Sequence, residues 1–218
     1  MNWINQSTFR RAQRIVLMIW LIATLLFSSS LSSSLQAAND QVIYAIKSNG
    51  DLLYYQYQGM RDGSNTWGQS GEKIGKRWKF RQVFSGGNGV IFAITDAGDL
   101  LYYKYRGLSD GSYAWDVTGA RIGNGWNFRQ VFSGGDGIIF AITQTGDLLY
   151  YQYLGMSNGA NAWGVSGAKI GNGWKFPQVF AGQDGAIFAI NDKGDLLYYK
   201  YLGMADGSNS WDVTGAKI

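Results

Sequence analysis

The sequence predicts an all-β fold, a β-propeller of four-stranded antiparallel blades, from a long internal repeat and an unusual composition. The chain of 218 residues has 31 glycines, 14 tyrosines and 9 tryptophans but a single proline, which is typical of strands joined by tight turns. A unit of forty-eight residues recurs, as in folds where each copy buries its faces only against its neighbours. The string GDLLYY, which marks the copies, begins at Gly50, Gly98, Gly146 and Gly194.

The first half of each repeat predicts two strands of a blade. In the second copy, residues 81–85 are short and β-prone, and a glycine-rich turn follows at residues 86–89. Residues 90–95, with the sequence VIFAIT, form a continuous apolar run of strand length. Such a run fits a strand that is covered on both faces. A blade stacked between two others requires this of its middle strands.

The second half of the repeat predicts two more strands. Gly98 offers the positive φ that a tight turn needs, and residues 100–105 form a third strand with no fully polar face. A long loop, residues 107–115, leads to a more polar fourth strand at residues 117–122. A flat stack or β-solenoid is the competing architecture, but solenoid coils are usually shorter than forty-eight residues. Four strands in each repeat therefore favour a propeller blade.

Residues 1–38 predict a secretory signal peptide. Arg10, Arg11 and Arg14 form a basic segment, and the apolar residues 15–27 follow it, before a small-residue ending suited to cleavage. An apolar run of thirteen residues is short for a membrane span. A twin-arginine signal and an uncleaved N-terminal anchor are the alternatives. We therefore expect a secreted or extracytoplasmic protein that meets a membrane only transiently, through its signal peptide.

The rest of the chain, residues 39–218, divides into four repeats. Their bounds are residues 42–88, 89–136, 137–184 and 185–218. The first repeat starts at the second strand of its blade and the last ends at the fourth. We therefore expect three complete blades and one three-stranded blade, an incomplete ring. The chain is then either a fragment of a longer array or a homo-oligomer that completes the ring with another copy.

Composition excludes most catalytic chemistry and argues against a nucleic-acid partner. The chain has no cysteine and no histidine, so the usual zinc and copper ligands and nucleophile pairs are missing. The acidic residues recur in register with the repeats, whereas a general acid and a general base need different environments. Without the signal peptide, sixteen basic residues stand against fifteen acidic ones. We expect no enzyme, no catalytic residue, no metal and no cofactor.

One stretch of the repeat carries a family resemblance. In the third copy it reads WGVSGAKIGNGWKF, residues 163–176. This stretch, and its copies over residues 42–218, resembles the tachylectin-2 family of β-propeller lectins. The resemblance implies a five-bladed type of propeller that binds N-acetylated sugars such as N-acetylglucosamine, with one site per blade. This sequence departs from the family pattern in two places. The family's Asp-Asn-Trp is Asn-x-Trp or Tyr-x-Trp here, and the family's Gly-Gly-Trp has one glycine fewer in this chain.

The resemblance also implies where a sugar would bind. Each site would combine the connector that arrives from the preceding blade with the loop before the outer strand. Tryptophan would cover the apolar face of the sugar ring, and Asp, Asn and backbone N–H groups would bind its hydroxyl and acetamido groups. In the first such pair, Arg77 replaces the connector glycine. The implied residues are Asp110, Trp115, Asn124, Gly125, Trp126, Asn158, Asn161, Trp163, Asn172, Gly173, Trp174, Asp206, Asn209 and Trp211.

The same residues also fit plain packing between repeats. We interpret Trp78 and its copies mainly as packing, and Trp67 and its copies as packing or ligand contact. Asp99 and its copies suit turn chemistry, and the tyrosines of GDLLYY suit packing between blades. Glu72 fits a solvated substitution. The expected partners are N-acetylated glycans on cell surfaces or envelope polymers, and the alternative function is a non-catalytic scaffold for protein–protein interaction.

Overall fold

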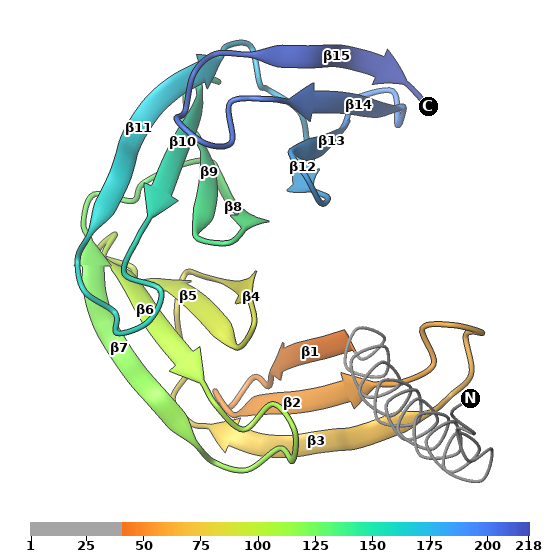
Figure 1. Cartoon of the computed structure of the whole chain (residues 1–218), viewed down its shortest axis with the longest axis vertical. Coiled ribbons are helices and arrows are strands. Elements are labelled where there is room, and N and C mark those ends of the chain that lie inside the picture. Colours follow the sequence, from red (N-terminus) through yellow and green to blue (C-terminus); the bar gives the residue numbers. More distant parts are fainter. Residues whose placement is uncertain (1–40) are drawn as a thin grey trace, which may run out of the picture. The chain divides into compact units, whose positions relative to one another are not determined.

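The structure is a computed structural model that describes residues 41–218, and every regular element in this range is a β-strand (Figure 1). The first blade holds β1 (Gln41–Ile46), β2 (Leu52–Tyr57) and β3 (Trp67–Gly75). The second holds β4 (Gln82–Gly87), β5 (Val90–Ile94), β6 (Leu100–Tyr105) and β7 (Trp115–Gly123). The third holds β8 (Gln130–Gly135), β9 (Ile138–Ile142), β10 (Leu148–Tyr153) and β11 (Trp163–Gly171). The fourth holds β12 (Gln178–Ala181), β13 (Ala186–Ile190), β14 (Leu196–Tyr201) and β15 (Trp211–Lys217).

The strands form antiparallel sheets with neighbours in sequence order, which confirms the predicted β-propeller blades. Each four-stranded blade takes its first strand from the end of one repeat and its other three strands from the next repeat. Three sheets have four strands and the first, β1-β2-β3, has three, as the sequence predicts. The third strand of the second blade spans the predicted residues 100–105. The fourth begins at Trp115, two residues earlier than predicted, because Trp115 pairs with Tyr105 across the sheet. The predicted signal peptide lies outside the described residues.

The chain divides into two compact units, which we describe separately. The described part of the smaller unit comprises residues 41–43 and 54–71, and the larger comprises residues 44–53 and 72–218. Within the larger unit, the second, third and fourth blades stand side by side (Figure 1). Their first strands are neighbours: β8 lies against both β4 and β12. The strands β7, β11 and β15 form the outer side of this array.

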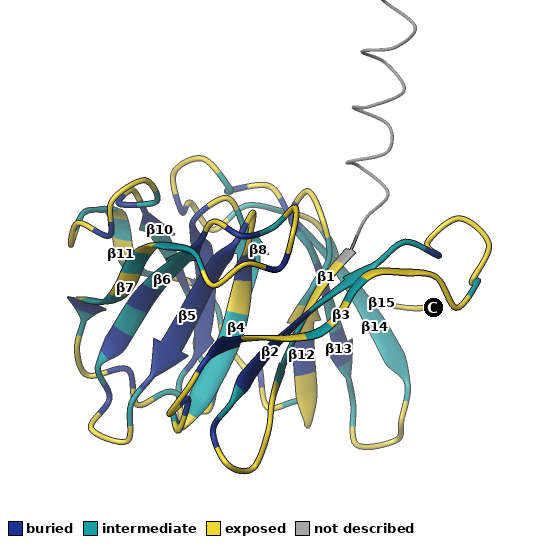
Figure 2. Cartoon of the chain, turned by 90° about the horizontal axis from the view of Figure 1, so that it is seen from below, coloured by how far each residue is buried: buried dark blue, intermediate teal, exposed yellow. Residues whose placement is uncertain are grey.

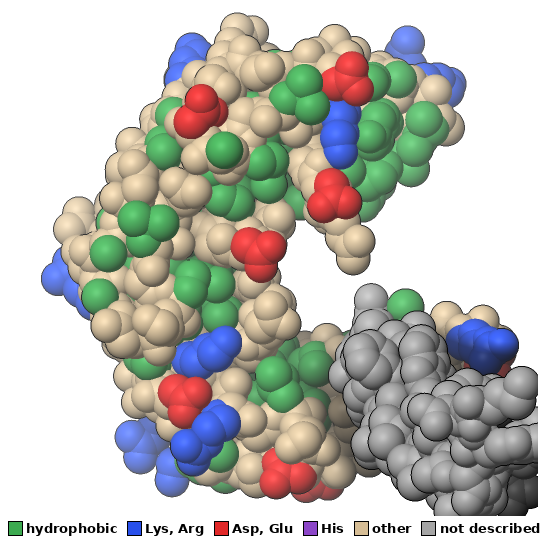
Figure 3. Space-filling view, viewed as in Figure 1, with side chains coloured by type: hydrophobic (Ala, Val, Ile, Leu, Met, Phe, Trp, Pro, Cys, Tyr) green, Lys and Arg blue, Asp and Glu red, His purple; other side chains and the backbone are tan. Residues whose placement is uncertain are grey.

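Packing between blades explains the continuous apolar runs. All residues of β5 and β9 are buried, and Figure 2 shows this for β5. Along β9 the side chains alternate: Ile139 and Ala141 pack with the second blade, whereas Ile138, Phe140 and Ile142 pack with the fourth. In β13 only Ile187 and Ala189 are fully buried, and they face the third blade. Hydrophobic side chains accordingly show at the surface over β13 and β14 (Figure 3).

In the second and third blades, the first tyrosine of GDLLYY links its blade to the next, which confirms the predicted packing role for these two copies. Tyr102 Oη donates a hydrogen bond to the backbone carbonyl of Met156, and Tyr150 Oη donates one to that of Met204. Both rings are fully buried. Beside the first contact, Gly159 lies so close to the Tyr102 ring that a Cβ at this position would clash with neighbouring side chains. The blades are therefore joined by specific polar contacts as well as by apolar area.

These tyrosines predict a loss of stability at alkaline pH. Burial, with a smaller effect of a nearby carboxylate, raises the pKa of Tyr102 and of Tyr150 to about 12. A tyrosine in the unfolded chain ionises at about pH 10, so on raising the pH the unfolded state loses these protons before the folded state does. We expect the free energy of unfolding to fall between about pH 10 and about pH 12.

Urea unfolding at a series of pH values measures this effect. The double variant Tyr102→Phe/Tyr150→Phe should lose less stability than the wild type over the same alkaline range. The variant also lacks two hydrogen bonds, which lowers its free energy of unfolding already at neutral pH. The two proteins are therefore compared by how steeply the free energy of unfolding falls with pH, and not by its absolute value. Equal slopes for the two proteins would contradict the assignment.

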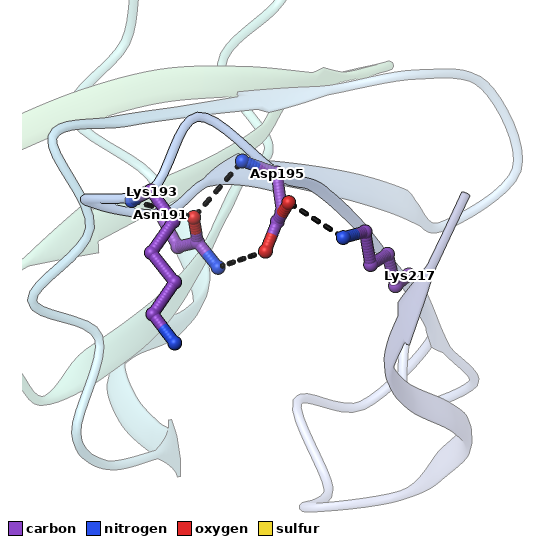
Figure 4. Close-up of polar contacts among 4 residues, drawn as sticks. All are labelled: Asn191, Lys193, Asp195 and Lys217. Carbon is purple, nitrogen blue, oxygen red and sulfur yellow. Dashed lines mark hydrogen bonds and ion pairs between the residues drawn. The ribbon is translucent and has the colours of Figure 1, made fainter.

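The Gly-Asp turns contribute more than the predicted turn chemistry, because each aspartate also pairs with the outer strand of its own blade. In the fourth blade, the Asn191 side chain contacts the backbone N–H and the carboxylate of Asp195 at 2.9 and 3.2 Å, and Lys217 Nζ lies 2.7 Å from Asp195 Oδ1 (Figure 4). The hydrogen bond from Lys217 lowers the pKa of Asp195. Such exposed pairs add little stability singly, so we interpret them as setting the register of the outer strand.

Candidate functional site

Each connector between blades ends in a buried tryptophan. Trp126 is 4% exposed, and its backbone N–H donates to the carbonyl of Gly98 in the preceding blade, at 2.9 Å. Its indole lies against Gly123, where a Cβ would come within 2.4 Å of Trp126 Nε1. A residue larger than glycine at the end of β7 would therefore displace the ring. Trp78 and Trp174 lie in the same way against Gly75 and Gly171.

The tryptophan at the start of the outer strand joins two blades. Trp163 Nε1 donates to the carbonyl oxygen of Ile122, at the end of the preceding outer strand, at 3.0 Å. It also lies 2.8 Å from Oδ1 of Asn161 in its own loop. The rings of Trp163 and Trp126 are 5.8 Å apart between centroids. Trp163 is only partly buried, so this residue both fixes the junction and presents part of its ring to solvent.

These two tryptophans form the walls of a cleft at the junction of the second and third blades. The cleft has a volume of about 260 Å³. Tyr151 lies 4.7 Å from Trp126 and Phe128 lies 5.6 Å from it, ring centroid to ring centroid. The lining residues are Ile122, Gly123, Asn124, Gly125, Trp126, Phe128, Tyr151, Asn161, Trp163 and Ser166.

The cleft combines an aromatic wall with neutral polar groups. Gly125 has a φ of 71°, and no other atom lies within 4 Å of the place where its Cβ would be, so the backbone stays open to a ligand. Asn124, Asn161 and Ser166 offer both donors and acceptors and carry no charge. Burial raises the pKa of Tyr151, so its hydroxyl stays protonated at neutral pH. The arrangement suits a small neutral ligand with hydroxyl or amide groups.

The other two junctions of the larger unit repeat this arrangement. Before the fourth blade, Trp174 stacks beside Trp211 with centroids 5.8 Å apart, and Tyr199 lies 4.6 Å from Trp174. Trp211 Nε1 donates to the carbonyl of Ile170 at 2.9 Å and lies 2.8 Å from Oδ1 of Asn209. At the connector that ends in Trp78, a cleft of about 200 Å³ is lined by Ile74, Gly75, Lys76, Arg77, Trp78, Phe80, Tyr103, Tyr113, Trp115 and Thr118.

The structure brings most of the predicted site residues together and leaves three outside the cleft walls. Asn124, Gly125, Trp126, Asn161 and Trp163 all line one cleft. Trp115 lines the first cleft, and Trp174, Trp211 and Asn209 are joined by the contacts given above. Asn172 and Gly173 hold the connector positions that Asn124 and Gly125 hold in the second cleft, and the φ of Gly173 is 72°.

Asp110, Asn158 and Asp206 do not line the two clefts whose walls are described, because each one closes a turn in its own loop. Asp110 Oδ1 accepts from the backbone N–H of Ser112 at 2.9 Å, and Asp206 Oδ1 accepts from Ser208 in the same way. These hydrogen bonds lower the pKa of both carboxyl groups. Asn158 Oδ1 accepts from the N–H of Ala160 at 3.0 Å. One side-chain oxygen of each residue is thus already engaged within the loop.

Sequence reasoning missed the second tyrosine of GDLLYY and the aromatic residue after the connector. Tyr151 and Phe128 line the cleft, as do Tyr103 and Phe80 at the first junction. A usable signal exists in the strand alternation, because successive tyrosines point to opposite faces of β10. Because Tyr150 faces the next blade, Tyr151 faces the connector that ends in Trp126.

The smaller unit holds a further copy of the loop tryptophan. Trp67 lies 5.0 Å from Tyr57 and 5.9 Å from Tyr55 between ring centroids, and its Nε1 lies 2.7 Å from Asn65 Oδ1. This is the same amide contact that Asn161 makes with Trp163. Trp67 is more exposed than its copies, at 39%.

The described residues show no cluster of the acidic, histidine or cysteine side chains that usually hold a metal ion. No group of three or more acidic, histidine or cysteine side chains gathers anywhere in residues 41–218. A search of the same range finds no helix with the length and apolar character that crossing a bilayer requires.

The repeated blades with aromatic residues at their junctions define the class of the protein, a β-propeller. A family model described as Tachylectin matches residues 23–107 and 45–218. The chain belongs to the Tachylectin family. No curated protein matches the chain.

Solved structures are similar to the chain at low identity. One is a symmetrical protein studied for its de novo evolutionary emergence, at 21% identity and a TM-score of 0.49, covering 73% of this chain and 66% of that one. Prp20p of Saccharomyces cerevisiae has 17% identity and a TM-score of 0.46, covering 81% and 48%. The BP39L lectin of Burkholderia pseudomallei has 19% identity and a TM-score of 0.45, covering 83% and 52%. The chain thus spans about half to two thirds of the length of these structures.

Proposed function

We propose that this protein is a secreted, multivalent lectin that binds N-acetylated sugars such as N-acetylglucosamine, with one sugar at each junction between blades. The observation that carries the proposal is the cleft between Trp126 and Trp163, with neutral amides from Asn124 and Asn161 at its edge. Aromatic rings cover the C–H face of a pyranose, and amide groups bind hydroxyl and acetamido groups. Family membership supports the sugar class.

The size of the cleft favours a single sugar residue as the bound unit. Its volume of about 260 Å³ lies just below the ~300–1,000 Å³ of clefts that bury drug-sized ligands. A shallow site of this kind reaches roughly millimolar affinity, about 4 kcal/mol. Several such sites on one chain gain about 100- to 10,000-fold on a dense glycan surface, because the later contacts are intramolecular. Repetition of the cleft then has a direct function.

Titration with N-acetylglucosamine, followed by tryptophan fluorescence and calorimetry, tests the proposal. We expect saturable binding at more than one site per chain, with glucose binding more weakly because it lacks the acetamido group. A folded protein that gives no response to either sugar would contradict the lectin function and favour a scaffold for protein–protein interaction.

A matched pair of variants locates the sugar. Asn161→Ala removes the amide that holds Trp163 at the cleft, and we expect it to weaken binding at that junction by about two- to tenfold. Asn158→Ala changes the same residue type three positions earlier in the same loop, outside the cleft wall. It should leave the affinity unchanged. Equal losses in the two variants would place the sugar on the loop and not in the cleft.

A further inference from the structure

The three blade junctions of the larger unit are not equivalent. At the two junctions before the third and fourth blades, the connector supplies Asn-Gly, at residues 124–125 and 172–173. At the first junction it supplies Lys76 and Arg77. The amide that follows in the loop is also lost there, since Tyr113 stands at the position of Asn161 and Asn209. Three positions of the first junction thus differ from the other two junctions.

The change alters what the cleft can bind. Asn offers a donor and an acceptor, whereas Lys and Arg offer donors only, and both carry positive charge. The first cleft therefore has two cations and no amide, and no acidic side chain lines it. Lys76 and Arg77 are exposed, and neither has an ion-pair partner within residues 41–218. Their charge is available to a ligand.

The backbone of Arg77 has the same left-handed conformation as the glycine at this position in the other connectors. Its φ is 64°, close to the 71° of Gly125 and the 72° of Gly173. The connector thus keeps the shape that glycine gives it at the other junctions, at the cost of a left-handed arginine. The aromatic wall is also kept: Trp78 lies 5.8 Å from Trp115 and 4.6 Å from Tyr103 between ring centroids. The tryptophans and the tyrosine of the wall are thus retained, whereas the residues at the polar edge differ.

We infer that the first cleft, edged by Lys76 and Arg77, binds an anionic saccharide, whereas the other two bind neutral sugars. The inference rests on the proposed lectin function. The aromatic wall takes the sugar ring, and the guanidinium and ammonium groups take a sulfate, phosphate or carboxylate on it. A planar guanidinium binds such groups through two parallel hydrogen bonds. One chain would then read two kinds of sugar.

Calorimetry with a matched pair of sugars tests the inference on the full chain. The probes are N-acetylglucosamine and its sulfated form, which differ by one anionic group. We expect one equivalent of the sulfated sugar to bind about tenfold more tightly than the neutral one at low salt, from the added charge-assisted hydrogen bonds. High salt should reduce this preference, because the cleft is open to solvent. Glucuronic acid against glucose separates a carboxylate preference from a sulfate preference.

Two reciprocal variants assign the preference to this cleft. Lys76→Asn/Arg77→Gly installs the connector of the other two junctions and relieves the positive φ, so it should fold at least as well and lose the preference for the sulfated sugar. Asn124→Lys/Gly125→Arg should add a second equivalent with that preference. Thermal unfolding of each variant confirms that it is folded before titration.

The outcomes separate this inference from the proposed function. Neutral sugar bound at two clefts, with no preference for the sulfated sugar in the wild type, overturns the inference and leaves the lectin function standing. A preference that survives in Lys76→Asn/Arg77→Gly also overturns it. Failure of both sugars to bind a folded protein overturns both proposals.

Discussion

Alanine at Trp126 is expected to lower the free energy of unfolding by about 3–5 kcal/mol, the usual loss for a large aromatic residue removed from a core. Trp126 is 4% exposed and contacts Phe128, Tyr151 and Trp163. The loss combines the transfer of the indole to water with the cavity left between two blades. Urea unfolding measures it, and a loss below about 0.5 kcal/mol, typical of surface positions, would contradict the burial.

The same substitution should remove one sugar site. The cleft at this junction loses a wall, whereas the junction formed by Trp174 and Trp211 keeps its own. We therefore expect the number of bound sugars per chain to fall by one. Trp126→Phe serves as the second variant if alanine prevents folding, because it keeps an aromatic wall and loses less buried volume. Unchanged stoichiometry in both folded variants would contradict the placement of the sugar.

Alanine at Gly137 is expected to destabilise the third blade more than alanine at Gly135, by about 1–3 kcal/mol, although both glycines lie at the same turn between β8 and β9. Their φ angles are similar, 80° and 85°. A Cβ on Gly137 would lie 2.3 Å from the backbone oxygen of Tyr153, whereas a Cβ on Gly135 would meet nothing within 4 Å. The two variants share the strain of a left-handed alanine, so their difference isolates the clash.

Thermal or urea unfolding of the two variants makes the comparison. Gly135→Ala carries only the backbone cost, roughly 1–2 kcal/mol. Gly137→Ala must also move the backbone of β10, since the Tyr153 N–H donates to the Gly137 carbonyl at 2.9 Å. Equal stability of the two variants would mean that this turn and β10 are not packed as described.

The sequence predicted the blades well because the information needed is local and repeated. An apolar run such as residues 90–95 and a Gly-Asp turn are readable in one copy, and the forty-eight-residue spacing confirms them in the others. The strand ends were less predictable: β7 begins at Trp115 because of its pairing with Tyr105, which the pattern of β7 alone does not reveal.

The candidate site was predicted only in part, because it is built from different blades. Trp126 and Trp163 stand out in the sequence as spaced repeats, but the partner of Trp163 Nε1 is a backbone carbonyl of another repeat, at Ile122. The roles of Tyr102 and Tyr151 depend on which face of a strand meets the next blade. Asp110 suits a turn and a ligand equally well from its sequence, and only its hydrogen bond to Ser112 separates the two.

The hydrogen bond from Trp163 to Ile122 joins two copies of the repeat, and this has a consequence for an array with more copies. A cleft belongs to a pair of adjacent copies and not to either copy alone. Duplication of one forty-eight-residue unit within the array therefore adds one complete cleft, already in register, without any new substitution. At positions 76 and 77 one copy differs from the others, so a substitution in a single copy alters one junction and leaves its neighbours as they are.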